Sequence, residues 1–297
     1  MTIGIVGNSE KPRLPEVAAQ LFRLLRDRSV PFLLHDELAP AFRGPAERLF
    51  LKGVALVSGA SLARRANVII SLGGDGTILR TARLIGAREI PILGVNLGKL
   101  GFLAEVNIED LQMAVSDVLE GRYQAESRMM LLADGKGLGK GGYGALNDIV
   151  IDLSGTARVI HVETRVNGVF VATFTGDGVM VSTPTGSTGY ALSNGGPIIT
   201  PDQSVMMISP ISPHNLTARP IVLPDTVTID LDVRSAPGKV HVTADGQPQL
   251  FTKAPVHVRV RKAPFRTILI KREGMDYFGV LRNKLQWGKD VRTDQLT

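Results

Sequence analysis

The sequence predicts an α/β N-terminal domain with a Rossmann-like parallel sheet, followed by a β-rich C-terminal domain that is antiparallel and sandwich-like. Its length of 297 residues is typical of about two domains. Up to residue 103, short apolar runs alternate with helical patterns, which is typical of parallel strands joined by crossover helices. From residue 128 to 272 strands and turns dominate, which indicates an antiparallel layered domain.

In the first domain, the spacing of apolar residues predicts the helices. Residues 15–29 carry Val17, Leu21 and Leu25 on one helical face. A later helix over 107–120 is expected to begin at its asparagine and to end before a glycine. Strands are expected at residues 3–6, 30–35, 54–57, 67–71 and 90–95, with a further helix over 78–85.

In the second domain, Asn167-Gly168 between two apolar runs is a strong hairpin signal. Gly137-x-Gly139-x-x-Gly142 has the letters of a dinucleotide fingerprint, but no helix follows, so we interpret it as a flexible hairpin loop. Strands are expected at 145–153, 158–166, 169–174, 205–208, 227–233, 240–243, 256–260 and 267–270.

The tail is helical again over 276–287, and an isolated terminal helix needs a docking surface, most simply the first domain. The predicted domains are therefore residues 1–103, completed by 272–297, and residues 104–271.

Composition narrows the class of protein. Cysteine is absent, which gives no support to disulfides or secretion, and neither a signal peptide nor a membrane span is recognisable, so the cytoplasm is expected. The net charge is +6, yet no basic run reaches five residues and aromatic residues make up only 5%. Platforms for stacking nucleic-acid bases are therefore scarce. We interpret the charge as a mild field that favours anionic small molecules.

The motif Gly73-Gly74-Asp75-Gly76-Thr77 lies between a predicted buried strand and a predicted helix. Glycines at a strand–turn–helix corner let the backbone approach a ligand, and the N–H groups of a helix N-terminus favour phosphate. A carboxylate beside phosphate is unfavourable unless it accepts a proton or holds a metal. Asp75 is therefore our candidate general base, with a simple helix N-cap as the alternative.

A second stretch, residues 175–193, is rich in hydroxyl groups and glycines and contains Tyr190. Hydroxyls and free N–H groups suit sugar hydroxyls and phosphates, and a tyrosine ring can stack on a base. Asn147-Asp148 interrupts a strand pattern, and Asp245-Gly246 lies between two strands. Taken alone, these pairs are better explained as a bulge and a turn.

Together, these stretches occur in the order seen in NAD kinases, which the chain resembles from about residue 65 onward. The most selective match is Thr-Pro-Thr-Gly-Ser-Thr-Gly-Tyr at 183–190, since Gly-Gly-Asp-Gly-Thr is shared with other kinases. Asp-Gly-Gln at 245–247, Gly-Gly-Pro-Ile at 195–198 and the segment 96–102 are similar to the same family.

The resemblance implies an active site between the two domains, a homotetramer or homodimer, and transfer of the γ-phosphoryl group of ATP, with Mg²⁺ or another divalent cation, to the 2′-hydroxyl of the adenosine ribose of NAD. The partners are then small molecules, with neither nucleic acid nor membrane among them. The protein ligands of the metal stay unassigned.

The resemblance also implies roles for residues. Asp75 would be catalytic, and Gly73, Gly74 and Thr77 would bind phosphate. Asp245, Gln247 and Arg80 are weaker candidates for the site. The residues expected to contact NAD are Gly76, Phe102, Asn147, Asp148, Asp177, Thr188, Gly189, Tyr190 and Ser193.

Two positions depart from the family pattern. Asp148 stands where the family usually has Glu, and Gly189 where it usually has Ala. Three alternatives stay open: a lipid kinase with the same glycine-rich corner, a dinucleotide sensor without turnover, and a nucleic-acid-binding protein. No membrane-seeking stretch supports the first. A nucleotide-selective thermal shift would oppose the last.

Overall fold

The computed structural model of the chain describes residues 1–98, 101–136, 138, 141–153, 159–234, 239–272 and 276–286. By its contacts the chain divides into two units. Unit 1 comprises Met1–Glu126 and the residues from Ile268 onward, and unit 2 comprises Ser127–Thr267. Each unit has its own apolar core.

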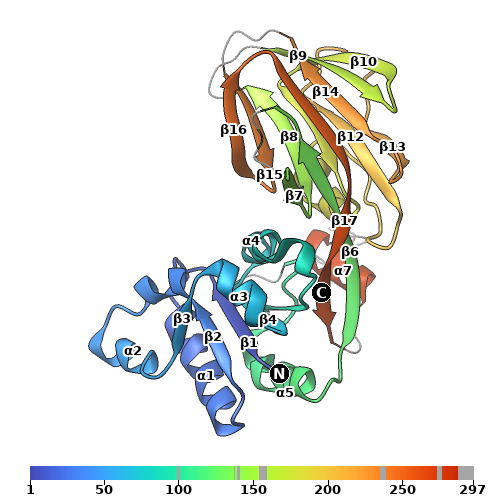
Figure 1. The fold of residues 1–297 in the computed structure, drawn as a ribbon. Helices are drawn as coiled ribbons and strands as arrows, with labels where there is room; N and C mark the ends of the chain where they lie inside the picture. Colours follow the sequence, from blue (N-terminus) through green and yellow to red (C-terminus); the bar gives the residue numbers. More distant parts are fainter. Residues whose placement is uncertain are drawn as a thin grey trace, which may run out of the picture. The chain divides into compact units, whose positions relative to one another are not determined.

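Unit 1 is built on parallel strands in the order β3-β2-β1-β4-β5 (Figure 1). The strands β1, β4 and β5 are buried throughout because helices cover both faces of the sheet. Their bounds are β1 Ile3–Gly7, β2 Phe32–His35, β3 Ala55–Val57, β4 Val68–Gly73 and β5 Ile92–Asn96. The predicted α/β domain with a mostly parallel sheet is confirmed.

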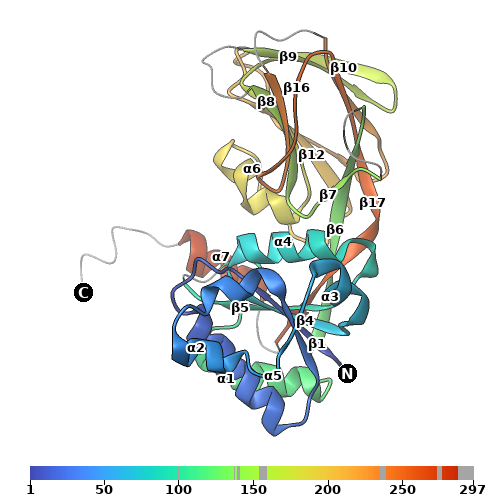
Figure 2. The ribbon, with the colours of Figure 1, turned by 60° about the vertical axis from the view of Figure 1, so that its left-hand side comes forward.

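In Figure 2, α1 (Leu14–Asp27) and α5 (Leu111–Leu119) lie on one face of this sheet, and α3 (Gly59–Arg65) and α4 (Asp75–Ile85) on the other. Strand order reverses between β1 and β4, so the sheet has its switch point at the carboxyl ends of these two strands. The glycine-rich motif lies at that switch point. The remaining helices before α5 are η1 Asp36–Ala41, α2 Pro45–Phe50, η2 Gly86–Arg88 and η3 Ile108–Asp110.

The contacts divide the chain after Glu126, whereas the sequence predicted a boundary at 103. The intervening segment belongs to unit 1 because Val106, Leu111 and Val115 pack into its core. The terminal helix α7 (Tyr277–Leu285) also falls in unit 1, and the Asp276 side chain caps it by accepting from Gly279 N at 2.7 Å. Residue 287, the last of the expected helix, lies outside the described residues.

Unit 2 has two antiparallel sets of strands, as predicted. One runs in the order β13-β12-β11-β8-β15-β16 and the other β10-β9-β14-β17, with β6 beside β17 and β7. Their inward side chains form one core. The bounds are β6 Gln124–Asp134, β7 Tyr143–Ala145, β8 Asp148–Leu153, β9 Ile160–Val166, β10 Val169–Gly176, β11 Gly178–Ser182, β12 Val205–Ile211, β13 Ile221–Pro224, β14 Ile229–Val233, β15 Lys239–Ala244, β16 Gln247–Lys253 and β17 Val256–Lys271.

The hairpin at Asn167-Gly168 is present, with φ of 50° and 79° and Val166 paired with Val169. The two strands expected at 256–260 and 267–270 are one strand, β17, because the intervening residues stay extended. The sequence did not predict strands β6, β7, β11, β13 and β16. Gly137 and Gly139 of the expected loop lie outside the described residues.

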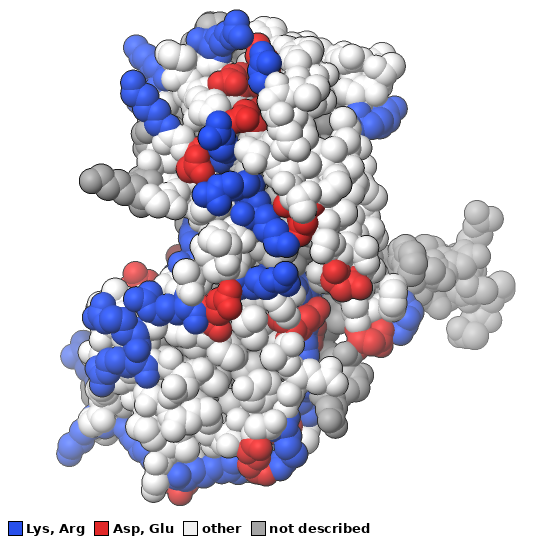
Figure 3. Space-filling view, turned by 45° about the vertical axis from the view of Figure 1, so that its right-hand side comes forward, with Lys and Arg blue, Asp and Glu red and all other residues white. Residues whose placement is uncertain are grey.

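Figure 3 shows lysines and arginines interspersed with acidic side chains, beside broad uncharged areas. Within the described ranges, no helix combines the length and apolarity needed to cross a membrane.

Candidate functional site

The Asp75 corner of unit 1 joins the end of β4 to the start of α4. The Asp75 carboxylate accepts three successive backbone hydrogen bonds from the loop after β5. Oδ2 accepts from Phe102 N at 2.7 Å, and Oδ1 from Leu103 N and Ala104 N at 3.0 Å each. Asp75 and Phe102, both predicted site residues, are thus brought together across 27 positions of sequence.

Gly101 lets this loop approach the carboxylate. An added Cβ there would lie 1.8 Å from Asp75 Oδ1, so no larger residue fits without moving the acid. Gly73 is similarly constrained, because its Cβ would lie 2.1 Å from Thr77 Oγ1. These two glycines therefore serve close packing.

The open side of the corner lies at Gly74 and Gly76, where an added Cβ would meet nothing within 4 Å. The helix that follows is eleven residues long, so its first-turn N–H groups and dipole favour an anion. Arg80, one turn further on, donates from Nη2 to the Gly7 carbonyl at the end of β1 and lies 4.0 Å from Glu37. A positive side chain is thus fixed at the switch point.

Asn96 is a residue that sequence reasoning did not assign. It ends β5 in register with Gly73, and its Oδ1 accepts from Gly98 N at 2.9 Å. Its Nδ2 is buried and finds no hydrogen-bond partner in the described part of the chain. The sequence could have pointed to Asn96, because it is a polar residue at the end of a predicted strand of the same sheet as the glycine-rich motif.

In unit 2, the Asn147-Asp148 corner is held by a second carboxylate. Asp245 Oδ2 accepts from Leu146 N at 3.0 Å, and Oδ1 accepts from Asn147 N at 2.7 Å and Asp148 N at 3.3 Å. The predicted residues Asn147, Asp148 and Asp245 therefore form one cluster. Gln247, also predicted, follows as the exposed first residue of β16.

The hydroxyl-rich segment packs on the carbonyl side of the same corner. Thr183 N donates to Asn147 O at 2.9 Å, and Thr183 Oγ1 donates to Leu146 O at 2.6 Å. A Cβ on Gly186 would lie 2.2 Å from Asn147 O. Thr183 belongs to the motif at 183–190 but had no predicted role. These two hydrogen bonds show that it holds the carbonyl groups of the Asn147-Asp148 corner.

Residues 185–193 form a short 3₁₀ helix, η4 (Thr185–Thr188), and one turn of helix, α6 (Tyr190–Ser193). Thr188 Oγ1 donates back to Thr185 O at 3.2 Å, and Ser193 is exposed at the end of the turn. A Cβ on Gly189 would lie 3.3 Å from Asn147 Nδ2, so the family's alanine would be a tight fit here. The buried Arg128, which the sequence did not single out, donates to Thr185 Oγ1 at 3.3 Å.

Asp148 is buried, with 5% of the residue's surface exposed. Burial, and then the negative charge of Asp245, raise its pKa from 3.8 to about 7. This side chain changes its charge near neutral pH, which an exposed aspartate does not.

Tyr190 lies beside several acids. Its ring is half exposed, and burial of the phenol raises its pKa, followed by the charges of Asp152, Asp177 and Asp148. Asp177 is exposed between β10 and β11 and donates its N–H to Ile211 O at 2.9 Å. The charge of Asp177 is therefore close enough to act on the Tyr190 phenol. Asp152 is an addition to this group, and its pKa is raised by burial against the opposing effect of His241.

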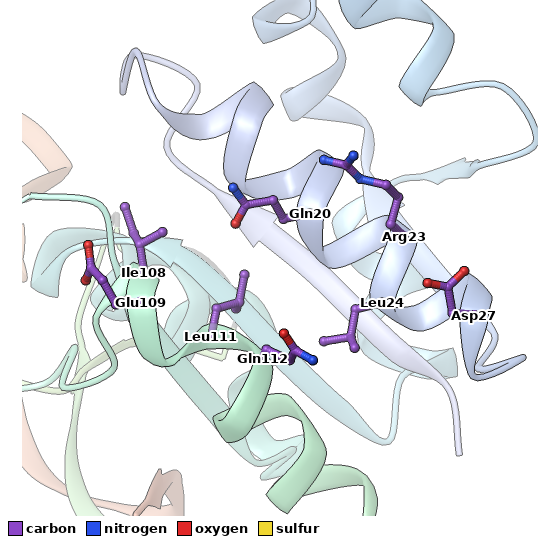
Figure 4. Close-up of a pocket in the computed structure, with 8 residues that line it drawn as sticks. All are labelled: Gln20, Arg23, Leu24, Asp27, Ile108, Glu109, Leu111 and Gln112. Atoms are coloured by element: carbon purple, nitrogen blue, oxygen red, sulfur yellow. The ribbon is translucent and has the colours of Figure 1, made fainter.

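The described residues contain no group of three or more His, Cys, Asp or Glu side chains that could hold a metal ion. A pocket of about 510 Å³ in unit 1 lies between α1 and the segment of η3 and α5 (Figure 4). Its walls carry Arg23 and Asp27 opposite Glu109, and none of the predicted site residues lines it. The predicted site residues thus fall into two separate groups, the Asp75 corner in unit 1 and the Asp148 cluster in unit 2.

Comparison with known proteins gives a consistent family. Residues 3–123 match the family model of the ATP-NAD kinase N-terminal domain, and residues 146–272 that of the ATP-NAD kinase C-terminal domain. The NAD kinase of Geobacter metallireducens is 40% identical over 292 residues, covering 97% of this chain and 99% of that protein. The NAD kinase of Heliobacterium modesticaldum is 40% identical over 291 residues, with the same coverage of both.

Two solved structures are similar over nearly the whole chain. Yeast NADH kinase complexed with NADH matches with a TM-score of 0.87 at 22% identity, over 98% of this chain and 89% of that one. An NAD kinase from Archaeoglobus fulgidus in complex with ATP matches with a TM-score of 0.76 at 26% identity, over 96% and 99%. At 22% identity, the similarity to yeast NADH kinase shows a shared fold and nothing more.

Proposed function

Because the chain belongs to the NAD kinase family, we propose that the Asp75 corner and the Asp148 cluster are its catalytic and NAD-recognising parts. The protein is a phosphotransferase that phosphorylates NAD with ATP as the donor, giving NADP. The observation that carries the assignment of residues is the fixed carboxylate of Asp75 at the switch point of the sheet.

Phosphoryl transfer depends on an aligned nucleophile and on compensation of charge. An ionised carboxylate has about four lone-pair positions, and Asp75 uses three of them on the loop 102–104. Since Oδ2 accepts only one of these bonds, it retains a position for the 2′-hydroxyl of the ribose. In our proposal Oδ2 accepts the proton, or directs the oxygen, as that oxygen attacks the γ-phosphorus of ATP. The bond between this phosphorus and the bridging oxygen breaks, and ADP leaves.

The phosphates of ATP would lie at the N-terminus of α4. Gly74 and Gly76 leave the approach open, and the backbone of Gly73 and Thr77 shapes the turn. Arg80 adds positive charge at the end of β1, where it compensates the phosphates.

The adenosine half of NAD would be recognised by Phe102, Asn147, Asp148 and Tyr190, with Thr188, Gly189 and Ser193 completing the contacts. Asp148 would accept a hydrogen bond from a sugar hydroxyl or from the adenine amine. Asp177 would contact the other nucleotide half. The half-exposed ring of Tyr190 offers a face for the base.

Magnesium, or another divalent cation, would enter with ATP. Mg²⁺ is usually held by one or two carboxylates together with substrate phosphates. When bound, the ion would neutralise charge on the phosphates, and the steps assigned above involve only residues of the protein.

We also propose self-association, as a homotetramer or homodimer. Edge strand β10 exposes Val169, Phe170 and Val171, and β13 exposes Ile221 and Val222. Edge strands of this kind pair with another chain unless charged residues protect them. The segment 166–176 contains no Lys, Arg, Asp or Glu. A cytoplasmic location stays a prediction.

The test of the function is to incubate the purified protein with ATP, Mg²⁺ and NAD and to assay NADP. We expect NADP to accumulate above a no-enzyme blank. Stabilisation by NAD without any NADP would support the sensor alternative.

A further inference from the structure

Asp245 occupies the tight turn between β15 and β16, in the left-handed region with φ of 51°, and Gly246 follows with φ of 69°. Both of its carboxylate oxygens accept hydrogen bonds from the backbone of residues 146–148, which link β7 to the start of β8. Oδ2 accepts from Leu146 N, and Oδ1 accepts from Asn147 N and Asp148 N. The Asp245 N–H in turn donates to Asp148 O at 3.0 Å. The corner and the turn are thus tied by four hydrogen bonds.

The other edge of this corner is fixed by Thr183, whose N–H and hydroxyl donate to Asn147 O and Leu146 O. The backbone of residues 146–148 is therefore bound by Asp245 through its N–H groups and by Thr183 through its carbonyl groups. A backbone fixed in this way determines the directions of the Asn147 and Asp148 side chains. Within the described residues, the structure gives the Asp148 carboxyl no hydrogen-bond partner.

We infer that Asp245 is a positioning residue for NAD, which aims Asn147 and Asp148 by binding their backbone and does not itself touch the dinucleotide. The inference rests on the proposed function of the Asp148 cluster. Asp245 also acts on Asp148 through charge, because its carboxylate is one of the causes that raise the pKa of Asp148. The titratable groups that face Asp148 are Asp245, from the β15–β16 turn, and Tyr190, from α6.

The experiment compares the full-length enzyme with Asp245→Asn, Asp245→Glu and Gly246→Ala. The dissociation constant for NAD is measured by calorimetry between pH 5.5 and 8.5, with a thermal melt of each variant. Gly246→Ala is the matched control, because it strains the same turn at positive φ while its Cβ meets nothing within 4 Å.

In the wild type, we expect NAD affinity to rise with pH as the Asp148 carboxyl ionises. Asp245→Asn should weaken binding at pH 8 about tenfold, within the range caused by small misplacements, and should move the midpoint of the pH dependence to lower pH. Asp245→Glu keeps the charge but displaces the oxygens, so it should weaken binding and leave the midpoint raised. Gly246→Ala should lower the melting temperature without moving the midpoint.

Unchanged affinity and midpoint in Asp245→Asn would overturn the inference and leave Asp245 as a turn residue. Loss of binding at every pH, equal in the Asn and Glu variants and without a shift of midpoint, would also overturn it by making Asp245 a direct contact. If Asp245→Asn does not fold, Asp245→Glu decides by the same readings. Failure of the proposed function would appear separately, as a wild type that neither binds NAD nor forms NADP.

Discussion

The Asp75 corner and the Asp245 turn use the same chemistry in different settings. In each, one aspartate accepts hydrogen bonds from three successive backbone N–H groups, 102–104 in unit 1 and 146–148 in unit 2. Asp75 begins a helix of eleven residues at the edge of a parallel sheet, whereas Asp245 lies in a two-residue hairpin turn. We call this arrangement of one carboxylate and three backbone N–H groups a clasp. In unit 1 the clasp holds a loop against a helix, and in unit 2 it orients the side chains of Asn147 and Asp148.

The difference teaches that three accepted N–H groups do not by themselves define a function. At Asp75 the neighbouring N–H groups of α4 make an anion site, so the remaining lone pair faces incoming substrate in our proposal. At Asp245 the neighbouring group is a second carboxyl, Asp148, whose pKa rises partly in response. The following predictions would break or sharpen this contrast.

The largest effect is expected from Asp148→Asn, on stability. Burial and the Asp245 charge raise the pKa of Asp148 from 3.8 to about 7. The folded state therefore binds the proton more tightly than the unfolded state does. The resulting stabilisation is fully present below about pH 4 and is lost as pH rises through about 7. Three pKa units correspond to roughly 4 kcal/mol, so Asp148→Asn should be more stable than the wild type at pH 8.

Urea unfolding of both proteins between pH 4 and 8 measures this effect, with equal free energies of unfolding expected near pH 4. Two profiles that run parallel across the range would contradict the raised pKa of Asp148.

Gly101→Ala tests the clasp at Asp75 without changing any functional group. Its Cβ would lie 1.8 Å from Asp75 Oδ1 and must displace the carboxylate. A misplacement of about 1 Å can lower turnover about 10²-fold, and we expect a loss of that order in steady-state NADP formation. Gly98→Ala is the control, because among the described residues the nearest atom to its Cβ would be Lys11 Nζ, at 3.9 Å. Equal turnover in the two variants would mean that the position of the carboxylate is unimportant.

Asp148→Ala tests how much the side chain oriented by the Asp245 clasp contributes to NAD affinity. A hydrogen bond to a charged group is worth about 1.5–3 kcal/mol, so NAD affinity at pH 8 should fall by between about tenfold and a hundredfold. Calorimetry with NAD measures this, and ATP affinity serves as the internal control. If NAD affinity is unaffected, the role of the family's glutamate has not passed to this shorter side chain.

Tyr190→Ala should have the smallest effect. Stacking on a base is worth about 1–3 kcal/mol, and we expect the lower end because the ring is 49% exposed. The Michaelis constant for NAD should rise about fivefold to tenfold, by more than turnover falls. An unchanged Michaelis constant would show that the ring is structural.

The sequence predicted the parallel sheet, most buried strands and the strand–turn–helix corner at Asp75, because each depends on local periodicity and on glycine. It did not predict β13 and β16, whose partly exposed edge positions show little alternation. The bond between Asp245 and Asn147 spans 98 positions and exists because β15 pairs with β8, which no local pattern specifies. For the same reason, the burial of Asp148 could not be foreseen.

Asp75→Asn keeps the shape of the side chain but replaces one carboxylate oxygen by an amide nitrogen. In the structure, this amide nitrogen would face a backbone N–H group that now donates to a carboxylate oxygen, so a hydrogen bond would be lost. Asp245→Asn makes the same exchange in the other clasp. Both variants should therefore lose stability, by about 1–3 kcal/mol each.

The central claim is tested most directly by turnover of Asp75→Asn, with Asp245→Asn as the matched clasp variant, at saturating ATP and NAD. A positioned base contributes about 10²–10⁴-fold, so Asp75→Asn should lose turnover by that factor, whereas Asp245→Asn should raise the Michaelis constant for NAD by more than it lowers turnover. Turnover largely retained in Asp75→Asn, or an equal fall in both variants, would contradict the assignment of Asp75 as the residue that activates the ribose hydroxyl.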